Sequence, residues 1–194
     1  TARMTDSSVI GIQIFSTPSN VREVVPISFY KDVKQQVQNT INTLNPDGAT
    51  STRSGFELAK QKLGQVISQN KFPGYKYNLI FISDGVPEVQ MPENQKNSQN
   101  CLVTAPYQGN IRCFARAQDP RTPTNIPSEI KGLGVDIYSI GITDSFDQPM
   151  KSELLQLMRD ASSDPDSKYF YESIDGNDLT TVLDHVLKSI CGTT

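Results

Sequence analysis

The sequence predicts an α/β fold in which a doubly wound, mostly parallel β-sheet has helices on both faces and one antiparallel edge strand. Short apolar segments alternate with stretches of helical periodicity along most of the 194 residues. These segments are continuous apolar runs, which are typical of strands buried on both faces of a parallel sheet. One of them contains Pro26, which cannot donate to a strand ladder and therefore fits an edge position.

Five segments are predicted as strands because they are short and rich in β-branched or aromatic residues. In chain order they are residues 9–15, 23–27, 77–83, 135–142 and 168–171. Five further segments repeat apolar residues at helical spacing. They are residues 29–44, 56–67, 126–133, 150–158 and 175–190, and residues 48–55 form a polar loop between the first two. Neither a repeat nor a linker divides this pattern, so we expect one domain over residues 1–194.

Residues 86–124 show no clear periodicity and are rich in Asn, Gln, Pro and Ser, which predicts a loop insertion. Cys101 and Cys113 lie in this polar stretch, which we interpret as a surface loop. A disulfide between them would close the loop and imply an oxidising compartment, whereas two free thiols are the alternative. Cys191 is left over, so it is predicted to be unpaired within this chain.

Composition and motifs exclude several functions. Eighteen basic and 21 acidic residues give a net charge of −3, which is unsuited to binding nucleic acid by phosphate neutralisation. No apolar run approaches the roughly 20 residues of a membrane span. His185, the single histidine, lies in a helical apolar stripe, and neither a Gly-x-Ser-x-Gly motif nor a phosphate-binding loop is present. We therefore do not expect an enzyme.

Polar residues stand where predicted strands end, which is where α/β sheets carry their functional groups. Asp84 and Gly85 directly follow the most apolar strand, and Thr50 lies in a Gly-Ala-Thr turn before a helix. Carboxylate and hydroxyl oxygens suit Mg²⁺, Mn²⁺ or Ca²⁺, so Thr50 and Asp84 are candidate metal ligands. Taken separately, each has an ordinary alternative role, since Asp-Gly is common in turns and helix caps.

The order of these segments resembles the von Willebrand factor type A family, which shares its fold with integrin inserted domains. The resemblance is carried by residues similar to the family's second strand, threonine loop, fourth strand with its aspartate, fifth strand and closing helix. In that order they are residues 10–16, 48–52, 79–85, 134–142 and those from 178 onward.

The resemblance implies a metal-ion-dependent adhesion site that binds Mg²⁺ or Mn²⁺, with a carboxylate of the protein partner completing the coordination. Thr50 and Asp84 match two of its five motif positions. Residues Ser51, Thr52, Gly85 and Glu88 would then shape the rim of the ligand-binding surface.

The chain departs from the family at the Asp-x-Ser-x-Ser motif, which follows the family's first strand and is absent here. Asp6-Ser7-Ser8 has the wrong spacing and precedes a strand. The first strand lies mid-sheet in the family, so we expect two interior strand edges without a partner. Three explanations stay open: a missing N-terminal segment of a longer polypeptide, a strand supplied by a separate chain, or a sheet rebuilt without that strand. Under the first two, Cys191 would pair outside this chain.

The resemblance favours an extracellular or cell-surface adhesion domain that binds a protein ligand. The domain would bind the metal only if the missing motif is supplied from elsewhere. The alternative is a metal-independent structural module of a surface filament, pilus or extracellular matrix. An intracellular relative with reduced cysteines is a further alternative.

Overall fold

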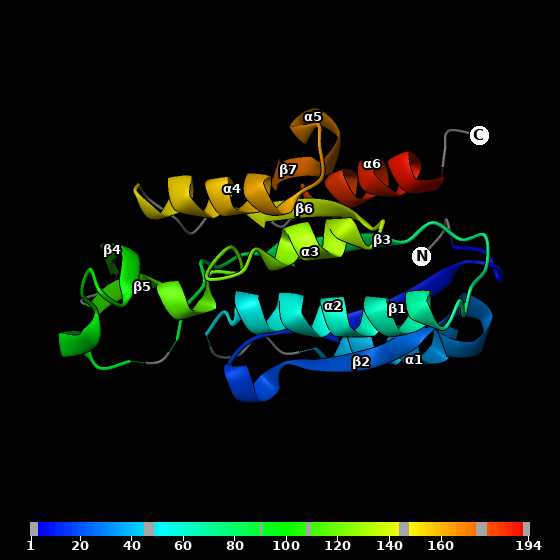
Figure 1. Cartoon of the computed structure of the whole chain (residues 1–194), viewed down its shortest axis with the longest axis horizontal. Coiled ribbons are helices and arrows are strands. Elements are labelled where there is room, and N and C mark those ends of the chain that lie inside the picture. The colour runs from blue at the N-terminus through cyan, green and yellow to red at the C-terminus, as the bar shows by residue number, and fades with distance from the viewer. Residues whose placement is uncertain are drawn as a thin grey trace.

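The computed structural model describes residues 4–44, 49–89, 91–107, 110–143, 148–173 and 178–191. The predicted stop of the first helix at residues 45–48 lies outside these ranges. Strands form the middle of the molecule, and helices cover them (Figure 1). None of the helices within the described ranges combines the length and the hydropathy needed to cross a membrane.

Three strands form a parallel sheet in the order β3-β6-β7, which confirms the predicted parallel arrangement. They are β3 (Asn78–Ser83), β6 (Asp136–Ile142) and β7 (Phe170–Ser173). Strand β6 lies between the other two, and its Ile137 and Ile140 are completely buried. The strand predicted at residues 168–171 begins later, because Asp166–Tyr169 form the short helix α5.

The first two strands form a separate antiparallel pair, β1 (Val9–Ile14) and β2 (Arg22–Phe29). A Cβ atom at Gly11 would stand 2.6 Å from the Ile27 side chain, so the glycine permits the close approach of these strands. Within the described ranges β2 pairs only with β1, which confirms the edge position predicted from Pro26. The strand continues to Phe29, and helix α1 begins at the next residue.

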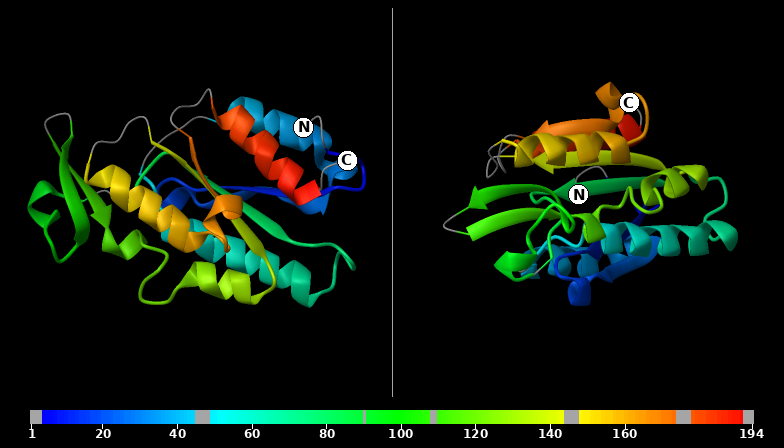
Figure 2. Two further views of the ribbon diagram at one scale, coloured as in Figure 1. Left: turned by 90° about the horizontal axis from the view of Figure 1, so that it is seen from above. Right: turned by 60° about the vertical axis from the view of Figure 1, so that its left-hand side comes forward.

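Helices cover both faces of the strands, as predicted (Figure 2). One face carries α2 (Thr52–Ser68), α3 (Ile126–Gly132) and α4 (Met150–Ala161), and the other carries α1 (Tyr30–Thr43) and α6 (Leu179–Cys191). The polar loop expected at residues 48–55 is shorter than predicted. Because the Gly55 N–H already donates to the Ser51 carbonyl, residues 52–55 form the first turn of α2.

The core is continuous on the α2 side and divided on the α1 and α6 side. Under α2, the ring centroid of Phe81 lies 5.6 Å from that of Phe15 and 4.6 Å from that of Phe56, so one cluster spans both sheets. On the other face, one cluster forms under α1 around Val25 and a second under α6 around Ile140. The division coincides with β1 and β3, which share no ladder in the described ranges and leave the two interior edges expected from the sequence.

The insertion at residues 86–124, which the sequence predicted as a loop, has secondary structure of its own. It contains a β-hairpin of β4 (Cys101–Tyr107) and β5 (Asn110–Ala115), which projects from one end of the molecule (Figure 1). Two single-turn 3₁₀ helices, η2 (Glu93–Gln95) and η3 (Arg116–Gln118), flank the hairpin. Its strands carry apolar residues such as Leu102, Val103 and Phe114, which sequence reasoning overlooked because polar residues and prolines surround them.

The predicted disulfide between Cys101 and Cys113 is confirmed, with an S–S distance of 2.06 Å. The surface location expected for it is wrong, because both cysteines are at least 96% buried. They pack with Ala115 and against Val89 and Met91, which lie in the segment leading to the hairpin. The disulfide is therefore the centre of a small second core. Cys191 is a free, exposed thiol at the end of α6.

Candidate functional site

Main-chain hydrogen bonds join the Thr50 loop to the ends of two strands. The Ser51 N–H donates to the carbonyl of Ser16, two residues beyond the end of β1, at 2.7 Å. The Glu88 N–H donates to the Thr50 carbonyl at 3.0 Å, in the segment that follows β3. The loop thus bridges the carboxyl ends of β1 and β3, at the edge of the sheet where the sequence predicted the site.

Thr50 lies directly against Gly85. A Cβ atom at Gly85 would stand only 2.5 Å from Thr50 Oγ1, so the absence of a side chain at Gly85 makes room for the threonine hydroxyl. The turn is held by Ser83, whose buried hydroxyl donates to the Gly85 carbonyl at 2.9 Å. Asp84, between these two residues, is exposed. The structure therefore brings together Thr50 and the Asp84–Gly85 turn, which are 34 residues apart by their numbering.

Ser51 and Thr52 do not lie on the rim where the resemblance placed them. Both are completely buried, because α2 begins at Thr52 and turns the chain inward. Neither side-chain hydroxyl has a hydrogen-bond partner. A buried hydroxyl without a partner is energetically unfavourable. These two hydroxyl groups lie beneath the candidate surface, and their hydrogen-bonding capacity is not used.

Glu88 lies at the rim, but its carboxylate is held by the hairpin. Its Oε1 lies 2.9 Å from Nε of Arg112 on β5, and both side chains are mostly buried. Burial raises the pKa of Glu88, and the neighbouring Arg112 guanidinium opposes this effect. The Ala115 N–H also donates to the Pro87 carbonyl at 2.7 Å, so the hairpin is fastened to the segment that follows β3.

Arg112 and Ser83 are functional candidates that sequence reasoning missed. Arg112 stood in a segment that was expected to be a loop, and nothing local indicates that it faces Glu88. A signal for Ser83 was available, because a serine that ends an apolar strand before Asp-Gly suits a turn-forming hydroxyl.

The described residues do not complete a divalent-metal site by themselves. They contain no group of three or more His, Cys, Asp and Glu side chains able to hold an ion. Thr50 and Asp84 would supply two oxygen ligands, whereas Mg²⁺ takes about six. This shortfall agrees with the absence of the Asp-x-Ser-x-Ser motif from the sequence.

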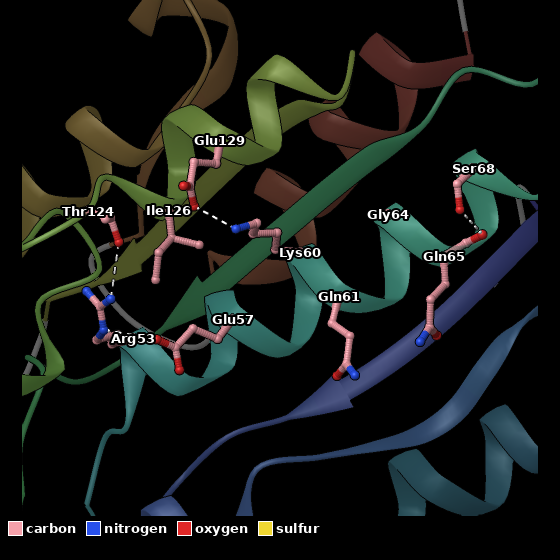
Figure 3. A pocket seen from close by; sticks show the side chains of 10 residues that line it. All are labelled: Arg53, Glu57, Lys60, Gln61, Gly64, Gln65, Ser68, Thr124, Ile126 and Glu129. Atoms are coloured by element: carbon pink, nitrogen blue, oxygen red, sulfur yellow. Dashed lines mark hydrogen bonds and ion pairs between the residues drawn. The ribbon is translucent and has the colours of Figure 1, made fainter.

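A shallow groove between α2 and α3 offers no alternative ligand set (Figure 3). Its charged side chains are paired with one another. Lys60 Nζ lies 2.9 Å from Glu129 Oε2, and Arg53 Nε lies 3.0 Å from Glu57 Oε1. Arg53 also donates to the Thr122 carbonyl and to Thr124 Oγ1, which ties the start of α2 to the segment before α3.

The family assignment follows from a sequence match over nearly the whole chain. The sequence model of the von Willebrand factor type A domain matches residues 3–185. The chain belongs to this family. Among curated proteins, no matching sequence was found.

Solved structures share the fold of this type A domain. The pilus adhesin SpaC from Lactobacillus rhamnosus GG, in its open conformation, superposes with a TM-score of 0.63 at 18% identity, covering 94% of this chain and 25% of the adhesin. Proximal thread matrix protein 1 from the mussel byssus, in a structure described as having a zinc-occupied MIDAS motif, gives 0.59 at 17% identity, covering 95% and 36%. The chain thus spans about a quarter to a third of the length of these neighbours.

Proposed function

We propose that this type A domain is an extracellular adhesion module that binds a protein ligand at the end of the sheet formed by Thr50, Asp84 and Gly85. The main support is that the Thr50 loop is hydrogen-bonded to the segments that follow β1 and β3. This arrangement places the Thr50 hydroxyl against the Asp84–Gly85 turn. Family membership supports a binding role over catalysis. The buried disulfide between Cys101 and Cys113 supports an oxidising, extracellular environment.

The proposed surface uses a divalent cation, Mg²⁺ or Mn²⁺, with Ca²⁺ as the other oxygen-preferring candidate. Thr50 would contribute its hydroxyl, and Asp84 its exposed carboxylate, directly or through water. The remaining oxygen ligands would come from water, from a carboxylate of the protein partner and from groups outside the described residues. Glu88 and the β4–β5 hairpin would border this surface, because the hairpin is fastened beside it.

The metal is tested by titrating Mn²⁺ into the natural, full-length protein and following bound Mn²⁺ by electron paramagnetic resonance. Thr50→Ala and Asp84→Asn should each weaken binding at least tenfold. Asp6→Asn is the matched control, since Asp6 is also an exposed aspartate but lies before β1. Binding that is equally strong in all three variants would place the ion elsewhere.

The protein ligand is tested with an array of peptides that each carry one Asp or Glu, printed beside the same peptides with that residue as Asn or Gln. Capture should need the carboxylate and be lost in EDTA and in Asp84→Asn. If Mn²⁺ changes neither capture nor stability, the metal-dependent adhesion function is contradicted.

The second candidate function is a metal-independent structural module of a filament, pilus or matrix. It is favoured by the disulfide-centred hairpin, which projects from one end of the molecule (Figure 1). Its signature is association that rises with concentration and persists in EDTA, measured by analytical ultracentrifugation. The proposed adhesion surface predicts no such association.

A further inference from the structure

We propose that the β4–β5 hairpin positions the Thr50 loop, and that Glu88 is the residue that joins the two. Arg112 on β5 is accordingly a positioning residue for the proposed adhesion surface. The consequence for ligand binding rests on the function proposed above, whereas the structural link between the hairpin and the loop does not.

The first observation is that Glu88 is held on two sides by two different parts of the residue. Its main-chain N–H donates to the Thr50 carbonyl at 3.0 Å, and its Oε1 lies 2.9 Å from Arg112 Nε. Both side chains of this ion pair are mostly buried, so loss of Arg112 would leave the Glu88 carboxylate without a counter-charge where water reaches it poorly. Glu88 would then shift, and its N–H would shift away from the Thr50 carbonyl.

The second observation is that the hairpin also contacts the neighbours of Glu88 in the sequence. The Ala115 N–H of β5 donates to the Pro87 carbonyl at 2.7 Å, one residue before Glu88. On the other side, the buried disulfide of the hairpin packs against Val89 and Met91. The hairpin therefore fixes this segment before, at and after the residue that holds the Thr50 loop.

The third observation is that the hairpin has internal bonds that make it a firm support. The disulfide joins its two strands. The Arg116 guanidinium donates to the carbonyls of Ser98 and Cys101 at 3.2 and 3.1 Å. The Ile111 N–H donates to Glu93 Oε2 at 3.3 Å, on the outer side of β5. All of these bonds lie within residues 93–116, so they hold the hairpin without using Glu88.

The Thr50 loop has a separate attachment on its other side. The Ser51 N–H donates to the Ser16 carbonyl beyond β1 at 2.7 Å. Figure 1 shows the hairpin at the end of the molecule where α2 begins, which is the end that carries this loop. Loss of the Glu88 bond would free the loop on the hairpin side only. The Thr50 hydroxyl would then lose its fixed position against Gly85.

The test compares Arg112→Met with Arg112→Lys, which keeps the positive charge, in the natural, full-length protein. Residue-resolved amide hydrogen exchange is measured in EDTA, so the result does not depend on a metal. The Glu88 N–H should exchange about tenfold faster in Arg112→Met, as loss of one hydrogen bond predicts, and more slowly again in Arg112→Lys. The Ser51 N–H should keep its rate in both variants, because its partner lies beyond β1.

Two further variants separate this link from a general loss of stability in the hairpin. Arg116→Met removes the other arginine that holds the hairpin, but its bonds lie within the insertion, so Glu88 exchange should not change. Replacing Cys101 and Cys113 by alanine reaches Glu88 by a different route, through Val89 and Met91. It should therefore speed Glu88 exchange as Arg112→Met does.

The effect on the adhesion surface is measured by Mn²⁺ titration of the same variants. Arg112→Met should weaken Mn²⁺ binding about threefold to tenfold, and Arg112→Lys should recover part of that loss. Electrostatics alone predicts the opposite for Arg112→Met, because removing a positive charge near the site would favour a cation. Weaker binding in this variant therefore reports the position of the Thr50 loop.

Several outcomes would overturn the proposal. They are unchanged Glu88 exchange in Arg112→Met, equal acceleration at Ser51 and Glu88, and an equal effect of Arg116→Met. Mn²⁺ binding that is unchanged or stronger in Arg112→Met would also overturn it, since the loop would then not depend on Arg112 or the released Glu88 carboxylate would itself be a ligand. If the wild type binds no Mn²⁺, the proposed function fails, and Glu88 exchange in EDTA still decides whether the hairpin positions the loop.

Discussion

The hydroxyl of Thr50 occupies the space that a side chain at residue 85 would fill. The relationship is steric, because a Cβ atom at Gly85 would stand 2.5 Å from Thr50 Oγ1 and 3.4 Å from Thr50 Cβ. The choice of glycine after Asp84 therefore determines the position of a threonine 35 residues earlier in the chain. A small change at Gly85 should accordingly alter the proposed ligand-binding surface.

Gly85→Ala should displace the Thr50 side chain and lower the free energy of unfolding by about 1–3 kcal/mol, as overpacking does. It should also weaken Mn²⁺ binding, because the hydroxyl leaves its position against the Asp84–Gly85 turn. Urea unfolding and the Mn²⁺ titration check the two effects. Gly132→Ala is the control: no atom lies within 4 Å of its Cβ position, so stability should be unchanged or slightly higher. Equal effects of the two substitutions would contradict the steric relationship.

Replacing Cys101 and Cys113 by alanine should destabilise the β4–β5 hairpin by about 2–4 kcal/mol, since the disulfide closes this segment and forms its small core. Hydrogen exchange across residues 101–115 and the rate of cleavage by trypsin report the loss locally. Cys191→Ser should change neither measurement, because that thiol is free and exposed. A hairpin that stays protected without the disulfide would show that strand pairing and the Glu88–Arg112 ion pair suffice.

Arg121→Met should cost about 3–5 kcal/mol of stability, because the buried carboxylate of Asp119 loses its charged partner and retains only the main-chain N–H of residue 121. Arg121 donates to both oxygens of Asp119 at 2.9 Å and to Asp160 at 2.7 Å, and the Asp119 side chain is 3% exposed. Lys60→Met is the control. It breaks an ion pair of similar length on the surface and should cost less than about 1 kcal/mol. Thermal unfolding compares the two; similar losses would refute the role of burial.

Asp136→Asn should destabilise the domain at neutral pH but not in strong acid. Burial alone would raise the pKa of Asp136, but hydrogen bonds from Lys76 and Tyr169, at 2.6 and 2.8 Å, outweigh it and lower that pKa. A lowered pKa in the folded state contributes stability above the unfolded pKa, and this stability is lost as pH falls through the folded pKa. The difference in the free energy of unfolding between wild type and Asp136→Asn should therefore shrink as the pH falls from the unfolded pKa through the folded pKa of Asp136. Urea unfolding at a series of pH values measures this difference.

The cause of that shift is tested with Tyr169→Phe, which retains the ring and removes one hydrogen-bond donor. Carbon-detected nuclear magnetic resonance titration of the Asp136 carboxyl should then give a pKa nearer its ordinary value. An unchanged pKa would assign the lowering to the charges of Lys76 and Lys168.

Outside the insertion at residues 86–124 and the short helix α5, the sequence by itself determined the order of the strands and helices, because each is encoded by apolar residues repeated at short range. Thr50 and Asp84 stay predicted metal ligands, and the structure places the Thr50 loop at the ends of two strands. The sequence also identified the edge strand from Pro26 and the disulfide partners from their shared segment. These inferences hold because backbone chemistry and burial against one neighbour leave a local pattern.

The tertiary structure alone decided which of these groups meet. The contact of Thr50 with Gly85, the burial of Ser51 and Thr52, and the ion pair of Glu88 with Arg112 join segments that lie far apart or turn inward. The pairing of β4 with β5 and the core divided between α1 and α6 were likewise visible only in the folded chain. All of these features have the same physical reason. Packing and hydrogen bonding between distant segments depend on the final path of the chain, which no local pattern of residues specifies.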